Sequence, residues 1–243
     1  MSTRLKLLCA WAGPAFLVLY GIAFWGIAGY IPPPDPVLTP GEINSFYAEN
    51  RTEIRIGQLG GLVASTLLFP FFALISLQIA RIERGRLPVL AMIQFGGAVL
   101  LLVFFAICSM LWVGATFRPE LDGATVRALH DLSWLMFVMV FPAYSLQMIC
   151  MAIAGFIDTS PHPTWPRWAA YFNLWVAFSG AGGGLAVFFK EGPFAWNGLI
   201  GFYLPVAVFA VWLSVTTWLL VRSVKRQAPE EVGRPEVGEQ PAL

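Results

Sequence analysis

Residues 49–58 form a charged stretch whose side chains could bind a ligand or take part in catalysis. The stretch continues without a turn into a long apolar segment. In a helix, Arg51, Arg55 and Gln58 lie on one face, because they are spaced four and then three residues apart. Guanidinium and amide groups on one face can bind the polar end of a ligand. This face is therefore the first part of a predicted binding site.

His130 and Asp131 form a second polar group, with Arg127 beside them. An imidazole next to a carboxylate could act in catalysis or pH sensing. Such a pair is more often a solvated helix start, where Asp131 complements the helix dipole. The aromatic connection that contains Lys190 and Asn197 is typical of an interfacial hairpin in which Lys190 extends to water. The alternative is a lid over an outer cavity, with both side chains pointing toward Arg55. The predicted ligand-binding residues are Arg51, Arg55, Gln58, His130, Asp131, Lys190 and Asn197.

Arg55 needs a partner at the membrane edge, because it lies one residue before the uncharged segment. Glu53 is two residues away and lies on another helix face. Asp131 begins its own apolar segment at a similar depth. We therefore predict an ion pair between Arg55 and Asp131, with His130 and Gln58 nearby.

The sequence gives no indication of a cofactor, a metal site or catalytic residues. His130 and His162 are predicted on opposite sides of a membrane, so they cannot bind one haem or one zinc ion. Cys9, Cys108 and Cys150 lie in apolar segments without a C-x-x-C motif, and we expect buried thiols. Motifs of the H-E-x-x-H, G-x-S-x-G and P-loop types are absent from the sequence. An enzyme is the least favoured class.

Two glycine pairs, Gly57 with Gly61 and Gly180 with Gly184, have the four-residue spacing that lets helices approach closely. We predict that the two pairs meet and join their helices. The alternative for Gly180–Gly184 is a helix break that lines a ligand cavity.

The elements that position these residues are membrane helices. Hydrophobic residues make up 58% of the 243-residue chain and charged residues 12%, and the mean hydropathy is +0.70. We predict an all-α polytopic membrane protein, a single bundle of six transmembrane helices in residues 1–226. The predicted spans are 7–30, 56–80, 88–114, 132–157, 168–189 and 197–221.

The distribution of Lys and Arg predicts the orientation. Ten of the 15 basic residues fall on the side of the two termini, and five on the other. Cytoplasmic loops carry the excess of Lys and Arg, so we predict a cell-membrane protein with both termini in the cytoplasm. The outer side then carries Arg51, Arg55, Arg118, Arg127 and Lys190.

Short amphipathic helices are expected on the outer face. Thr39-Pro40-Gly41-Glu42 is a capping-box sequence, and Ile43, Phe46 and Tyr47 follow on one helix face. A weaker pattern in residues 116–131 has Asp122 as its cap. The polar tail, 227–243, is predicted to be a disordered cytoplasmic segment.

Tryptophan positions support the predicted spans. Four residues near the outer span ends are expected to anchor the protein at the membrane interface. They are Trp25, Trp112, Trp134 and Trp196.

Three functions remain open. The first is a protein that binds or passes an apolar or amphipathic small molecule through an outer-leaflet site, without ion coupling, since no charged residue lies deep in a span. The second is a non-catalytic partner or scaffold subunit that binds another membrane protein or a second copy of itself. The third is an interfacial enzyme using His130, Asp131 and Glu53. Membrane lipids are expected partners, and nucleic acid is not.

Overall fold

The computed structural model describes residues 2–84 and 87–232, with side chains described as far as residue 227. This part of the chain is all-α, without a strand. It contains six helices that are long and apolar enough to cross a membrane, so the predicted fold class is confirmed. The spans are Thr3–Ile27, Arg51–Ile82, Val89–Phe117, Gly123–Ile157, Arg167–Phe188 and Leu199–Gln227.

Several spans consist of more than one helical element. The first combines α1 (Thr3–Gly21) with the π-helix η1 (Ile22–Ile27), and the third is α5 (Val89–Phe117) alone. The fifth is made of α8 (Arg167–Ser179), α9 (Ala181–Gly184) and the 3₁₀ helix η2 (Leu185–Phe188). The sixth combines the π-helix η3 (Leu199–Tyr203) with α10 (Leu204–Val232).

Prolines follow the breaks in the second and fourth spans. The second is divided into α3 (Arg51–Ser65) and α4 (Leu68–Ile82), and the fourth into α6 (Gly123–Met139) and α7 (Phe141–Ile157). Proline lacks an N–H and its ring clashes with the carbonyl four residues earlier. Pro70 and Pro142 therefore account for the interruptions just before them.

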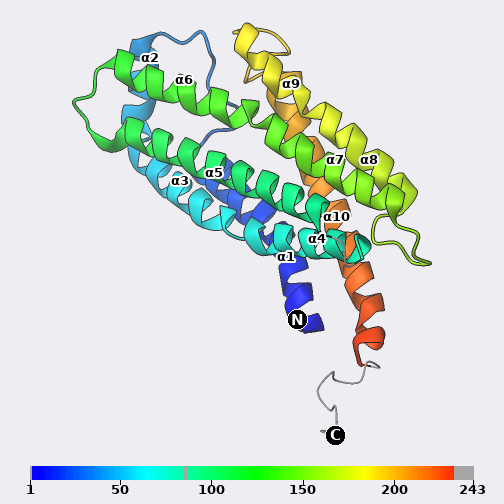
Figure 1. Ribbon diagram of the computed structural model, residues 1–243. Helices are drawn as coiled ribbons and strands as arrows, with labels where there is room; N and C mark the ends of the chain where they lie inside the picture. The colour runs from blue at the N-terminus through cyan, green and yellow to red at the C-terminus, as the bar shows by residue number, and fades with distance from the viewer. Residues whose placement is uncertain (1, 85–86, 233–243) are drawn as a thin grey trace, which may run out of the picture.

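The start of α1 and the end of α10 lie at the same end of the bundle, as Figure 1 shows, and we refer to this end as the termini end. Helix α5 packs against α3, α4, α6 and α7, while α1 packs against α4 and α10. Large apolar side chains such as Leu59, Met92 and Phe178 are exposed on the outside of the bundle. An apolar exterior of this kind is expected where lipid chains surround the helices.

The short helix α2 (Pro40–Glu49) lies at the end opposite the termini and packs against α6 (Figure 1). Its predicted capping box is present, with the Glu42 N–H donating to Thr39 Oγ1 at 3.3 Å and the Thr39 N–H donating to Glu42 Oε2 at 2.7 Å. These hydrogen bonds hold the pKa of the Glu42 carboxyl below its usual value. Ile43 and Tyr47 are buried on the predicted face.

The structure differs from the predicted boundaries at two further places, after Asp122 and at the start of the tail. The helix predicted to begin after Asp122 does so, with the Thr125 N–H donating to Asp122 Oδ1 at 3.0 Å, but it continues into the fourth span as α6. Helix α10 extends to Val232, beyond the predicted tail boundary at residue 227. The rest of the predicted tail, 233–243, lies outside the described residues.

The orientation remains a prediction. In a variant lacking the native cysteines, Ser45→Cys on exposed α2 should react with a membrane-impermeant maleimide in intact cells. Reaction only after permeabilisation would place α2 in the cytoplasm and reverse the predicted topology.

Candidate functional site

Arg55 binds the end of a neighbouring helix and not an acidic side chain. Its guanidinium donates to Thr116 Oγ1 at 3.1 Å, to the Thr116 carbonyl oxygen and, at 3.1 Å, to the Phe117 carbonyl oxygen. These are the last carbonyl groups of α5, which lack partners within the helix and carry the negative end of its dipole. The predicted ion pair with Asp131 is therefore wrong.

Asp131 instead pairs with Arg127 on its own helix, at 3.7 Å between Arg127 Nε and Asp131 Oδ2. Both side chains are about one third exposed. The carboxylate also interacts electrostatically with Lys190, which is exposed in the connection between η2 and η3. Arg51 and Asn197 are half-buried and Gln58 is buried. The seven predicted residues thus range from buried to exposed, and no side-chain hydrogen bond or ion pair joins any two of them in the described part of the chain.

His130 lies inside the protein, in a chain of hydrogen bonds with two tyrosines. The Tyr30 hydroxyl donates to the Tyr47 hydroxyl at 3.2 Å, and the Tyr47 hydroxyl lies 2.9 Å from His130 Nδ1. The other imidazole nitrogen, Nε2, is buried without a hydrogen-bond partner among the described residues. Burial raises the pKa of the Tyr47 hydroxyl, which keeps it protonated. His130 therefore contacts Tyr47, while Asp131 pairs with Arg127.

Aromatic rings surround this chain. The Tyr30 ring centroid is 5.0 Å from that of Trp112 and 5.6 Å from that of Trp134, and His130 lies 6.0 Å from Trp196. Such distances are typical of edge-to-face aromatic packing. We define the aromatic cluster as Phe24, Tyr30, Tyr47, Trp112, His130, Trp134, Phe137, Trp196 and Phe202.

Three tryptophans predicted to anchor the protein in the membrane interface are buried in this cluster. Trp112 and Trp134 are fully buried, and Trp196 is 5% exposed and donates to the Pro34 carbonyl oxygen at 2.9 Å. Only Trp25 of the predicted outer set is exposed. The interface-anchor prediction is wrong for the other three, because α2 and the Pro-rich segment before it cover this end of the bundle.

A separate apolar cavity of about 500 Å³ lies beside the aromatic cluster. Its lining comes from α1, η1, α5, α6, α7, η3 and α10, and Phe24, Phe137 and Phe202 belong to both the cluster and the cavity wall. None of the seven predicted ligand-binding residues lines it. Both π-helices contribute to it, and π-helical turns within α-helices occur frequently at functional sites.

The cavity reaches the outside of the bundle between the first and last spans. Trp25 of η1 and Val206 of α10 both line it, and they are 63% and 40% exposed. Both residues lie within the apolar spans. The exposed edge of the cavity therefore includes residues from two apolar spans.

Two tyrosines with buried hydroxyl groups belong to the cavity wall. Tyr20 and Tyr144 both line it, and their hydroxyl groups are buried without a hydrogen-bond partner among the described residues. An unpaired buried hydroxyl is unfavourable by about 1–3 kcal/mol. A ligand oxygen that accepts a hydrogen bond from either hydroxyl would remove that cost.

The predicted contact between the two glycine pairs is wrong. A Cβ atom on Gly57 would lie 2.5 Å from the Ala23 carbonyl oxygen, and one on Gly61 would lie 3.3 Å from the Tyr20 ring. These two glycines therefore pack against the first span. Gly180 and Gly184 face Tyr144 and Phe141 of α7.

Gly180 also corresponds to the alternative prediction of a helix break. It separates α8 from α9, and it lines the apolar cavity. A Cβ atom there would lie 2.9 Å from the Tyr144 ring. Close packing and a break that lines a cavity thus occur at the same residue.

The sequence-based prediction missed the cavity and its tyrosines. Tyr20 and Tyr144 lie within apolar segments, where the sequence pattern does not distinguish a tyrosine from the other aromatic residues. The burial of Tyr47 had a signal, since it follows Ile43 by one helical turn. No group of three or more His, Cys, Asp and Glu side chains among the described residues is placed to hold a metal ion.

Comparison with protein-family models, curated proteins and solved structures found no match to this chain. The fold itself defines the class. The chain is an all-α, multi-pass membrane protein with six apolar spans.

Proposed function

We propose that the protein binds an apolar or amphipathic small molecule that enters the cavity from the bilayer between the first and last spans. The ligand class is a single acyl or isoprenoid chain with one or two hydrogen-bonding oxygens. The observation that carries this proposal is the roughly 500 Å³ apolar cavity with two unpartnered tyrosine hydroxyls. Ligand pockets are typically apolar with few polar groups that fix the ligand's orientation.

The position of the cavity favours a lipid-like ligand. All of its lining residues except Ile31 lie within the apolar spans, and Trp25 and Val206 at its edge are exposed on the apolar exterior. A soluble polar substrate would have to cross the hydrocarbon region to enter. We accordingly assign the ligand site to the cavity, and not to the seven polar residues near it.

The other two functions have less support. The glycine pairs that suggested subunit association pack within the chain. The residues that suggested an enzyme are separated, since His130 is fully buried, Asp131 pairs with Arg127 and Glu53 is exposed.

The experiment is a ligand-dependent thermal shift in lipid nanodiscs, with a long-chain fatty alcohol as the probe. The alcohol should raise the unfolding midpoint of the parent protein. Ala210→Trp places an indole in the cavity and should abolish most of that increase. Val63→Trp, at an exposed position on α3 away from the cavity, should keep it.

A second variant tests the proposal without filling the cavity. Tyr144→Phe removes a hydroxyl that has no partner among the described residues, so the ligand-free protein should be equally stable or more stable. The same variant should reduce the shift given by the fatty alcohol and leave that given by the matching alkane unchanged. Equal alcohol shifts in the parent, Ala210→Trp and Tyr144→Phe would contradict the proposal.

A further inference from the structure

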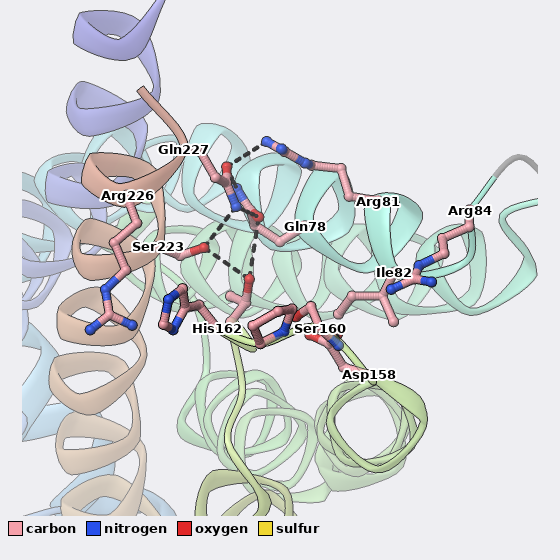
Figure 2. Close-up of a pocket in the computed structure, with 12 residues that line it drawn as sticks. Gln78, Arg81, Ile82, Arg84, Asp158, Ser160, His162, Ser223, Arg226 and Gln227 are labelled. Carbon is pink, nitrogen blue, oxygen red and sulfur yellow. Dashed lines mark hydrogen bonds between the residues drawn. The ribbon is translucent and has the colours of Figure 1, made fainter. Parts of the chain in front are cut away.

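A second, polar pocket of about 280 Å³ lies at the termini end, where α4, α10 and the connection between α7 and α8 meet (Figure 2). Two helices end beside it, α4 at Ile82 and α7 at Ile157. The pocket is therefore at the depth where the apolar spans give way to polar segments.

Four polar side chains form a hydrogen-bonded floor. Gln227 Nε2 donates to Gln78 Oε1 at 2.9 Å and to Ser223 Oγ at 2.8 Å. The hydroxyls of Thr164 and Ser223 are 2.9 Å apart. Gln78, Thr164 and Ser223 are each less than 8% exposed. This buried network joins three segments that are far apart in the sequence, which makes the floor a fixed part of the structure.

Basic groups form the rim of the pocket. Figure 2 shows Arg84 and Arg226 on opposite sides, with His162 between them, and Arg81 directed toward Gln227, to which it donates. Asp158 is the acidic residue of the lining, and its Oδ1 accepts the Ser160 N–H at 2.9 Å. The described lining residues thus include three guanidinium groups and one carboxylate, and of the three Arg81 is already bound to Gln227.

We propose that this pocket binds a phosphate group, most directly the phosphodiester of an anionic phospholipid headgroup. Guanidinium groups bind phosphate oxygens in bidentate fashion. Ser160 and His162 offer further donors from the connecting segment. The depth of the pocket suits a headgroup whose chains lie beside α4 and α7. A free phosphate ion has the same binding chemistry, so the test must separate the two sources.

The test compares nanodiscs of phosphatidylcholine alone with nanodiscs that also contain phosphatidylglycerol. Native mass spectrometry should show phosphatidylglycerol retained by the parent protein, and a double variant, Arg84→Gln with Arg226→Gln, should retain on the order of tenfold less. Both side chains are exposed, so the bundle should still fold. The matched control is Lys225→Gln, which removes one exposed positive charge from α10 outside the pocket and should behave like the parent.

A second experiment adds inorganic phosphate to the protein in phosphatidylcholine nanodiscs, at constant ionic strength, and measures stabilisation. Stabilisation by phosphate but not by phosphatidylglycerol, lost in the double variant, would support the phosphate site with a soluble ligand. A loss in Lys225→Gln of half that in the double variant or more would overturn the proposal, because general attraction to a charged surface scales with the charges removed, here one against two. An absence of effect from both probes would overturn it as well.

Discussion

Replacing His130 with alanine is expected to lower the free energy of unfolding by about 2–5 kcal/mol. The side chain is fully buried between Trp134 and Trp196, so its removal leaves a cavity in the aromatic cluster. It also leaves the Tyr47 hydroxyl, 2.9 Å from Nδ1, without that partner. Reversible unfolding in mixed detergent micelles measures the change.

The neighbouring residue supplies the control. Asp131→Ala should cost no more than about 1 kcal/mol, because its pair with Arg127 is partly exposed and lies within one helix turn. If Asp131→Ala were as damaging as His130→Ala, the polar group at this end would be a buried charge network, and the separation of His130 from Asp131 would be wrong.

Gly57→Ala is expected to destabilise the bundle by about 1–3 kcal/mol, although it adds only one methyl group. The new Cβ would lie 2.5 Å from the Ala23 carbonyl oxygen and 2.6 Å from the Ala28 Cβ, so α3 must move away from the first span. The midpoint of thermal unfolding should fall accordingly.

Gly96→Ala is the matched substitution on α5. A Cβ there meets nothing within 4 Å, so alanine should stabilise the helix by about 0.5–1 kcal/mol. The two variants should therefore change stability in opposite directions. Equal small effects would show that the close approach at Gly57 does not contribute to packing.

The sequence predicted the features that depend on neighbouring residues. The six spans follow from apolar segments longer than a bilayer needs, and the caps at Thr39 and Asp122 follow from residues three positions apart. Such signals are complete within a short window, so they do not depend on how the helices are arranged.

Contacts between distant segments could not be predicted in the same way. Charge and similar depth in the sequence predict that Arg55 pairs with Asp131, but carbonyl oxygens at the end of α5 accept the hydrogen bonds of its guanidinium. Nothing in the sequence around Thr116 marks those carbonyls as acceptors. Trp112 and Trp134 show the same limit, because a tryptophan near a span end can anchor in lipid or pack inward.

The apolar cavity depends on even more distant residues. Its walls combine Phe16, Tyr144 and Phe209, which come from the first, fourth and sixth spans. Each of them has the local pattern of an ordinary membrane-facing or core residue. A void between such residues is a property of the assembled bundle, and no local pattern indicates it.

Photocrosslinking in nanodiscs tests the cavity's role most directly. A long-chain fatty alcohol bearing a diazirine should crosslink mainly to residues that line the cavity, such as Phe105, Val206 and Phe209, and Ala210→Trp should suppress those products. Crosslinks spread over lipid-facing residues such as Met92 and Phe178, unchanged in Ala210→Trp, would contradict a ligand site between the first and last spans.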